Sequence, residues 1–314
     1  MKKLINLFLV LSIALGACNP NSNRSLDSKI TKANKYYEAG LLQDSLKQFD
    51  SAMVSFSKAI STNPNFTDAY KHRAVIHVRL NDFNKAINDY NKVIEIAPNY
   101  PDIYKSRAFA KELSQDFIGA IEDYNYILKS DSTNKWAYYS RARTKGNLVD
   151  YRGAIIDYYK AVEIDPTFKY AYCSIGLSKY ELLDYKGAII AYNQAINIDS
   201  NYVQAYFFRG KSKGALEDYK GSIADLSKAI EINPGNAEAY YLRGSSKCLL
   251  LDYRGGIADF NSAIEINPKY AIVYCQRGLV KITLGQKDSG CLDLSKAGEL
   301  GYEEAYTAIK LYCQ

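Results

Sequence analysis

Residues 237–270 read AEAYYLRGSSKCLLLDYRGGIADFNSAIEINPKY, and this stretch decides the fold. Small and apolar residues recur at helical spacing up to Gly244 and again from Gly256, and the segment Leu251-Asp252-Tyr253 separates the two runs. Asn267-Pro268 ends the second run, because the residue before a proline is pushed away from helical angles. The stretch therefore predicts two amphipathic helices joined by a short turn.

The same pattern recurs along the chain with a period of 34 residues. Five of the seven prolines fall in one row at this spacing, which reads Pro64, Pro98, Ser132, Pro166, Ser200, Pro234 and Pro268. A second row is tyrosine at all eight places, Tyr36, Tyr70, Tyr104, Tyr138, Tyr172, Tyr206, Tyr240 and Tyr274. A fixed period of this length predicts stacked supersecondary units rather than a closed globule.

These rows resemble the tetratricopeptide repeat, a 34-residue helix–turn–helix unit with aromatic, small and proline residues at set places. The resemblance implies an all-α, right-handed α-solenoid of eight repeats, at residues 33–66, 67–100, 101–134, 135–168, 169–202, 203–236, 237–270 and 271–304. Residues 303–314 are expected to add a C-terminal capping helix. One departure is that arginine mostly stands where the family has leucine in the first helix.

The N-terminus predicts export. Met1-Lys2-Lys3 precedes an apolar run from Leu4 to Leu15, which is short for a membrane span. The following Leu15-Gly16-Ala17-Cys18 resembles the bacterial lipoprotein signal. We therefore expect a signal peptide at 1–17, a lipid on Cys18, a flexible polar tether at 18–32, and a place in the bacterial cell envelope, periplasmic or at the cell surface. An ordinary signal peptide and an uncleaved anchor are the alternatives.

Two further rows vary together and predict ion pairs. Six repeats have arginine in the first helix and aspartate sixteen residues later, whereas the first and fifth repeats have neither. The pairs are Arg73 with Asp89, Arg107 with Asp123, Arg141 with Asp157, Arg209 with Asp225, Arg243 with Asp259, and Arg277 with Asp293. Recent duplication of whole repeats is the alternative explanation.

The ion pairs argue against nucleic-acid binding. The net charge is +6, and removal of Lys2 and Lys3 with the signal lowers it to +4. If the arginines are neutralised, little free positive charge remains. A row of lysines, Lys111, Lys145, Lys179, Lys213, Lys247 and Lys281, is interpreted as solvated ends on buried stems.

No nucleophile–base pair, phosphate-binding loop or carboxylate dyad stands out, so no enzyme activity is predicted. Two histidines and cysteines without paired spacing also predict no metal site, and no cofactor is expected besides the lipid. Cys291 and Cys313 are the one pair of cysteines that the repeat spacing could bring together. Two free buried thiols are the favoured interpretation and a disulfide is the alternative.

In the resembled fold the first helices line a concave groove that binds peptides. The positions that correspond in this chain include an aromatic set in the middle repeats, and aromatic residues and arginine dominate interface energetics. The candidate groove residues are Trp136, Tyr139, Arg143, Tyr170, Tyr180, Phe207 and Tyr241. The alternative is that these rings pack between repeats.

The sequence thus predicts a membrane-tethered scaffold that binds a protein segment and assists complex assembly. A lysine–asparagine clamp for chaperone tails is missing, because Val75 follows Lys71 and Phe109 follows Lys105. The second hypothesis is an envelope lipoprotein that captures carbohydrate or another nutrient on the same aromatic rings.

Overall fold

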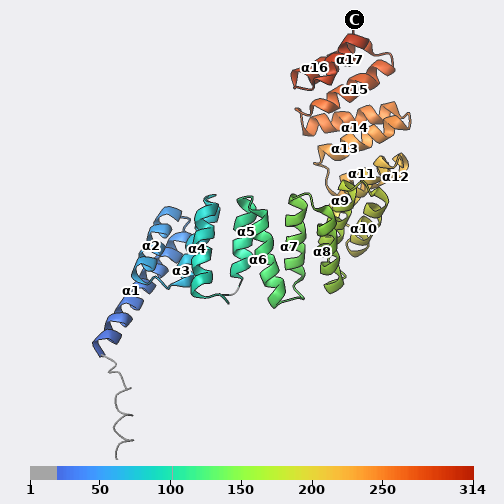
Figure 1. The fold of residues 1–314 in the computed structure, drawn as a ribbon. Helices are drawn as coiled ribbons and strands as arrows, with labels where there is room; N and C mark the ends of the chain where they lie inside the picture. The colour runs from blue at the N-terminus through green and yellow to red at the C-terminus, as the bar shows by residue number, and fades with distance from the viewer. Residues whose placement is uncertain (1–19, 101) are drawn as a thin grey trace, which may run out of the picture. The chain divides into compact units, whose positions relative to one another are not determined.

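The computed structural model describes the backbone of residues 20–100 and 102–314, and the side chains from residue 27 onward (Figure 1). The signal peptide and Cys18 lie outside the described residues. Every regular element in the described part of the chain is an α-helix, which confirms the all-α prediction. None of these helices has both the length and the apolar character of a membrane-spanning segment.

The chain divides into an N-terminal unit, residues 1–127, and a C-terminal unit, residues 128–314. The N-terminal unit holds α1 (Pro20–Ser45), α2 (Phe49–Thr62), α3 (Thr67–Arg79), α4 (Phe83–Ile96), α5 (Ile103–Leu113) and most of α6 (Phe117–Ser130). Within this unit α1 packs on α2, and α3 packs on α4. These pairs correspond to the first two repeats predicted from the sequence.

The C-terminal unit holds five further helix pairs and a last helix. They are α7 (Lys135–Asn147) with α8 (Tyr151–Ile164), α9 (Lys169–Glu181) with α10 (Tyr185–Ile198), α11 (Val203–Ala215) with α12 (Tyr219–Ile232), α13 (Ala237–Leu249) with α14 (Tyr253–Ile266), and α15 (Ala271–Thr283) with α16 (Lys287–Glu299). The last helix, α17 (Glu304–Tyr312), packs on α16 as the predicted cap.

The first helix is longer than expected. Residues 18–32 were predicted to form a flexible tether, but α1 begins at Pro20 and continues through Ala33, which is buried. Proline is well suited to the first helical position, where its missing N–H leaves no bond unmade. From Pro20 onward the segment is therefore helical rather than a loose linker.

Aspartate and glycine together begin the second helices. Asp116, Asp150, Asp184, Asp218 and Asp252 each accept a hydrogen bond from the backbone N–H of a glycine three residues later, at 2.9–3.0 Å. At Gly187, for example, an added Cβ would lie 2.1 Å from Asp184 Oδ2. In repeat 2 Lys85 takes the glycine place, and Asp82 makes no cap bond but pairs with the Lys85 amine at 3.0 Å. The glycines thus make room for the caps.

Small residues let the two helices of a repeat approach each other. A Cβ on Gly278 would lie 2.7 Å from the carbonyl oxygen of Gly290, and a Cβ on Gly244 would lie 3.0 Å from that of Gly256. The core between the helices is filled by rings and branched side chains such as Phe260 and Leu294, which are 1% and 0% exposed. Close packing of this kind explains the rows of small residues in the sequence.

The turn inside each repeat places one residue in the left-handed region. These residues are Lys47, Asn81, Gln115, Val149, Leu183, Glu217 and Leu251, with φ between 59° and 66°, and Gly285, with φ of 79°. The conformation costs an L-residue about 1–2 kcal/mol, while glycine adopts it freely. A β-branched residue such as Val149 is especially unusual there.

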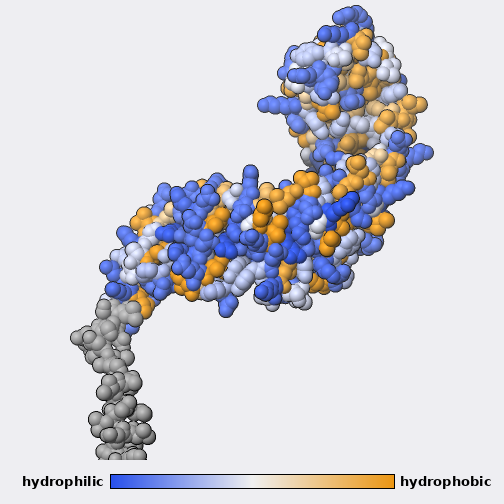
Figure 2. All heavy atoms as spheres, viewed as in Figure 1, coloured by the Kyte–Doolittle hydropathy of each residue, from blue (hydrophilic) through white to orange (hydrophobic). Residues whose placement is uncertain are grey.

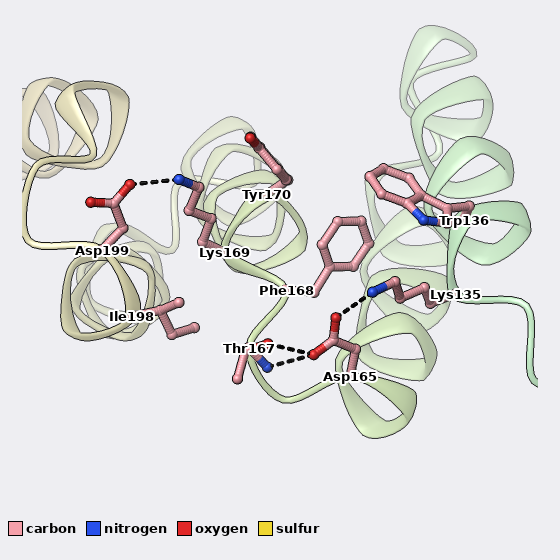
Figure 3. Close-up of a pocket in the computed structure, with 9 residues that line it drawn as sticks. All are labelled: Lys135, Trp136, Asp165, Thr167, Phe168, Lys169, Tyr170, Ile198 and Asp199. Atoms are coloured by element: carbon pink, nitrogen blue, oxygen red, sulfur yellow. Dashed lines mark hydrogen bonds and ion pairs between the residues drawn. The ribbon is translucent and has the colours of Figure 1, made fainter.

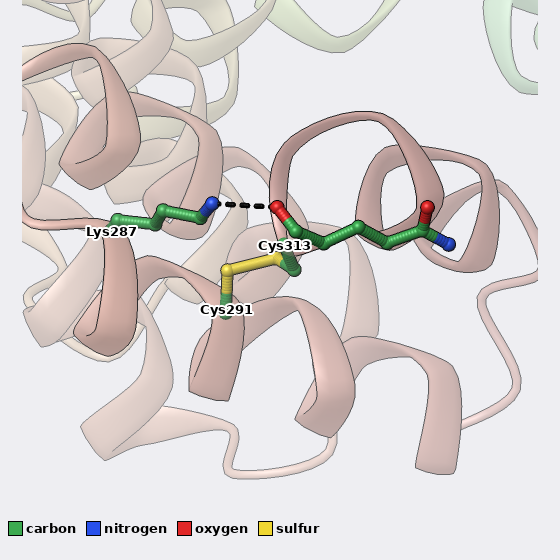
Figure 4. The surroundings of a disulfide bond; sticks show 4 residues. Lys287, Cys291 and Cys313 are labelled. Atoms are coloured by element: carbon green, nitrogen blue, oxygen red, sulfur yellow. Dashed lines mark hydrogen bonds between the residues drawn. A yellow bond between two sulfur atoms is a disulfide. The ribbon is translucent and has the colours of Figure 1, made fainter.

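The end of the chain is closed by a disulfide (Figure 4). Cys291 of α16 bonds to Cys313, which follows α17, and their Cα atoms lie 5.8 Å apart. The expectation of two free thiols is therefore wrong for this pair. Lys287 Nζ also donates a hydrogen bond to the carbonyl oxygen of Gln314 at 2.8 Å. Both contacts hold α17 and the residues after it against α16.

Candidate partner-binding site

The six predicted ion pairs are all present. In each repeat the arginine Nε and Nη2 donate to the two carboxylate oxygens of its aspartate, at 2.5–3.0 Å. The aspartates are only 2–7% exposed. Each guanidinium also lies 5.3–5.6 Å from the ring centroid of the tyrosine three residues before it. In these six repeats the tyrosine ring therefore contacts the guanidinium of the ion-paired arginine.

A further row of polar residues links arginines to the preceding repeat. Arg73, Arg107, Arg209, Arg243 and Arg277 donate from Nη1 to Ser57, Asn91, Asn193, Ser227 and Asn261, each sixteen residues earlier, at 2.6–3.0 Å. In repeat 5, where Ile175 replaces the arginine, the residue sixteen positions earlier is Tyr159. In repeats 2, 3, 6, 7 and 8 the arginine thus bonds to a polar residue sixteen positions earlier as well as to its aspartate, which supports physical pairing.

The lysine row is not merely solvated, contrary to expectation. Lys111, Lys145, Lys213, Lys247 and Lys281 bring Nζ within 2.7–3.1 Å of the same buried aspartates. Lys179, whose repeat lacks the aspartate, lies 3.7 Å from Asp184 instead. The sequence could have shown this, because the lysine follows the arginine by one helical turn. Most of the apparent basic stripe is thus part of the internal structure.

A pocket of about 490 Å³ lies between repeats 4 and 5 (Figure 3). Lys135 and Trp136 come from the start of α7, and Lys169 and Tyr170 from the start of α9. The lining residues are Lys135, Trp136, Asp165, Thr167, Phe168, Lys169, Tyr170, Ile198 and Asp199. All of them belong to the C-terminal unit.

The rings of the pocket form a connected series. The centroid of Phe168 lies 4.7 Å from that of Trp136 and 6.0 Å from that of Tyr170, both in edge-to-face geometry. Tyr170 in turn lies 5.9 Å from Tyr202. Phe168 is 4% exposed, while Trp136 and Tyr170 are 49% and 44% exposed. A buried ring therefore supports two rings that face solvent.

Two ion pairs hold the polar side of the pocket. Lys135 Nζ lies 2.5 Å from Asp165 Oδ2, and Lys169 Nζ lies 2.5 Å from Asp199 Oδ2. The Thr167 backbone N–H and hydroxyl both donate to Asp165 Oδ1, at 2.9 and 2.7 Å. Hydrogen bonds from Lys135 and Thr167 lower the pKa of Asp165 to about 2, and the bond from Lys169 lowers the pKa of Asp199. Both carboxylates are thus ionised and paired at neutral pH.

The structure brings together three of the seven predicted groove residues. Tyr139 lies beside the pocket, 6.1 Å from Trp136 and 5.2 Å from Phe168 between ring centroids. It is half-buried and also contacts Tyr158 in the core. Arg143 is exposed on the same helix. The packing interpretation therefore holds for part of the Tyr139 ring, while Trp136 and Tyr170 keep open faces.

The other three aromatic candidates belong to different clusters. Phe207 was expected in the groove but is 6% exposed, because it packs in the core with Leu226 and Ala239. Tyr180 and Tyr241 are half-buried, and burial raises the pKa of both hydroxyls. Tyr241 packs 5.6 Å from Tyr270. A single continuous aromatic groove is therefore not what the C-terminal unit presents.

The sequence analysis did not include Lys135 and Lys169 among the site residues, although the repeat pattern distinguishes them. At the first position of the repeat, repeats 4 and 5 have Lys135 and Lys169, whereas the other repeats from the second onward have Thr, Pro, Val or Ala. The next position is aromatic in the same two repeats and Asp, Gln, Glu or Ile in the others. Lysine and aromatic residue thus occur together where the pocket forms.

Family models for the tetratricopeptide repeat match residues 35–66, 67–100, 137–168 and 170–202, and a TPR repeat model matches 210–246. The first four ranges coincide with helix pairs, and the last runs from the middle of α11 through α12 into α13. The chain is a tetratricopeptide repeat protein. No curated protein matches its sequence. Among the described residues of this TPR protein, no cluster of His, Cys, Asp and Glu is arranged to hold a metal ion.

Solved structures share the fold of this TPR protein at low sequence identity. A TPR protein from Parabacteroides merdae is 19% identical, with a TM-score of 0.58, over 79% of this chain and 99% of its own. The C-terminal part of a TPR protein from Cytophaga hutchinsonii is 17% identical, with a TM-score of 0.63, over 76% and 97%. YrrB, described as a TPR protein with an unusual peptide-binding site, is 20% identical, with a TM-score of 0.53, over 60% and 99%. At these identities the likeness shows the fold alone.

Proposed function

We propose that this TPR protein is a membrane-tethered, non-enzymatic scaffold of a bacterial cell envelope. It binds a segment of a partner protein at the pocket between α7 and α9 and assists the assembly of a larger complex. Its partners are proteins or peptides rather than nucleic acids, because most of its arginines and the lysines beside them are internally paired.

The observation that carries this proposal is the exposure of Trp136 and Tyr170 in one pocket. Tryptophan and tyrosine are enriched among the residues that dominate binding energy, especially where a pocket desolvates them. The neighbouring Lys–Asp pairs keep charged groups in place that can hydrogen-bond to a backbone or side chain. A volume of about 490 Å³ accommodates a few side chains of a peptide.

Export and membrane attachment rest on the N-terminal sequence. Leu15-Gly16-Ala17-Cys18 after an apolar run is the expected acylation signal, and the lipid would be covalently held on Cys18. The disulfide between Cys291 and Cys313 supports an oxidising compartment, since disulfides are rare in the cytosol.

Crosslinking in intact cells tests the proposal. A photoreactive amino acid in place of Pro166, which is exposed and adjoins the pocket turn, is expected to capture a protein partner. The combined substitution Trp136→Ala with Tyr170→Ala should abolish this capture. The matched control is the same probe in place of Pro234, because repeat 6 has the same turn but no aromatic pair. Equal capture from both positions, or none from Pro166, would count against the pocket.

Carbohydrate capture is the second candidate, because exposed rings beside charged pairs also suit a sugar. Glycan-array binding that is lost with Trp136→Ala, in the absence of any crosslinked protein, would favour it over the scaffold.

A further inference from the structure

The pocket between repeats 4 and 5 is made of two copies of one arrangement (Figure 3). The first copy is Lys135, Trp136, Asp165 and Phe168, and the second, one repeat later, is Lys169, Tyr170, Asp199 and Tyr202. In each copy the ammonium donates to the aspartate at 2.5 Å and lies 5.1–5.8 Å from the centroids of both rings. Two like copies side by side suit a ligand whose own structure repeats.

The unused hydrogen-bonding capacity of the pocket is mostly that of donors. Both oxygens of Asp165 and of Asp199 already accept a hydrogen bond. Each lysine ammonium has three N–H groups and gives one of them to its aspartate. The Trp136 indole N–H is a further donor, with no partner in the part of the chain that the structure describes. A ligand that accepts hydrogen bonds without donating them therefore fits best.

Most ligand classes do not match this set of donors. An extended segment of ordinary residues has an N–H beside each carbonyl group, and these N–H groups would find few acceptors here. A helical segment uses its carbonyl groups internally. A sugar hydroxyl donates as well as accepts, while the carboxylates that would receive its proton are ion-paired. Proline has no N–H, and the polyproline II conformation leaves its carbonyl groups free to accept.

The spacing of the exposed rings also matches polyproline II. The centroid of the buried Phe168 ring lies 4.7 Å from that of Trp136 and 6.0 Å from that of Tyr170. The two exposed rings are therefore separated by no more than the sum of these distances. One turn of polyproline II contains three residues and advances about 9 Å. Prolines three residues apart can thus contact one ring each.

We propose that the segment bound in this pocket is proline-rich and adopts the polyproline II conformation. Its proline rings pack on Trp136 and Tyr170, and its carbonyl groups accept from the indole and from Lys135 and Lys169. Aromatic surfaces suit such segments, because the ligand is already ordered before it binds. This inference rests on the proposed function and names the class of segment that the scaffold binds.

The fluorescence of Trp136, the only tryptophan of the chain, tests the proposal on the full chain. Capped octaproline should shift the emission to shorter wavelength in a saturable way, because Trp136 is 49% exposed and would lose water. A Gly-Ser peptide of the same length should have no effect. Tyr170→Ala should weaken octaproline binding about tenfold. Tyr159→Ala is the matched control, since Tyr159 is similarly exposed on α8 but does not line the pocket, and it should bind octaproline normally.

The absence of a saturable shift with octaproline, or equal binding by Tyr170→Ala, would overturn the proposal. A shift with chitohexaose but not with octaproline would overturn it in favour of carbohydrate. The crosslink from position 166 separates this inference from the proposed function. A captured segment rich in proline supports both, whereas a captured segment without proline refutes the proline-rich ligand and leaves the scaffold standing. If octaproline binds but no partner is captured in cells, the scaffold fails and the ligand class stands.

Discussion

In five of the six repeats that have the buried aspartate, this residue pairs with an arginine and a lysine at once. Asp225, 4% exposed, accepts from Arg209 Nε and Nη2 at 2.8 and 2.5 Å, and Lys213 Nζ lies 2.8 Å from it. Repeat 5 shows the alternative, with Ile175 and Ala191 in place of the pair. The repeat therefore folds with either an Arg–Asp ion pair or two apolar side chains at these two positions.

Removal of one partner should be much worse than removal of both. Asp225→Ala leaves two cations in a partly buried site and should lower the free energy of unfolding by about 3–5 kcal/mol. Adding Arg209→Ile and Asn193→Tyr to Asp225→Ala reproduces the repeat 5 residues and should recover much of that loss. Urea unfolding of the single and combined variants measures both. Strictly additive losses would show that the residues do not act together.

The free cysteines are predicted to be unreactive in the folded protein. Burial raises the pKa of Cys173 and of Cys248 to about 11, so both thiols stay protonated at pH 8. Iodoacetamide, which reacts with the thiolate, should label neither within minutes at pH 8. Mass spectrometry should then find rapid labelling of both after unfolding in urea. Fast labelling of native Cys173, which is 4% exposed, would contradict its placement in the core.

At the scale of helices, the packing of the last repeat depends on the disulfide between Cys291 and Cys313. Leu294 and Ala297 of α16 are buried together with Ala305 and Ala308 of α17. The disulfide spans 22 residues and ties α17 to this cluster. Loss of α17 would expose the apolar side of α16 that it covers.

Reduction of the disulfide should therefore loosen the C-terminal end first. A loop of this length implies a stabilisation of about 3 kcal/mol in the chain-entropy model. Dithiothreitol should lower the thermal unfolding temperature and speed hydrogen exchange in α17 before it does so in α13. In the matched control, Cys291→Ser with Cys313→Ser, the reductant should change neither quantity. An identical response in the two proteins would mean that the bond does not form.

At the scale of the whole molecule, charge is concentrated inside the repeats. A net charge of +6 suggests a basic protein, but most arginines and many lysines are paired with aspartate or glutamate. Figure 2 shows hydrophilic residues over much of the visible surface, with hydrophobic residues between them. The positions of the charged residues therefore say more about possible partners than the net charge does.

Membrane attachment through the N-terminus is a prediction for the entire chain. Cys18→Ala should leave the precursor without a fatty acid and reduce its recovery in the membrane fraction. Metabolic labelling with a radioactive fatty acid checks the first effect, and fractionation checks the second. Cys248→Ser is the control and should label like the natural protein. Continued labelling of the Cys18→Ala variant would exclude the proposed lipid site.

Much of the fold could be predicted from the 34-residue period, because each repeat brings its own helix pair and turn. The Arg–Asp pairs could also be predicted, since loss of one partner is accompanied by loss of the other. Phe207 could not be placed, because a residue at a groove position turns toward the core when its neighbours leave space there. The disulfide was left open for a similar reason, as sequence spacing alone does not fix the distance between two cysteines.

The sequence by itself determined the repeat, its helices and its internal ion pairs, because these depend on residues at fixed spacing within a repeat or its nearest neighbour. Only the tertiary structure decided that Lys135, Trp136, Lys169 and Tyr170 share one pocket. It also decided which aliphatic residues stay exposed in the turns. Side-chain direction and burial depend on how neighbouring repeats pack, and the 34-residue period does not determine that packing.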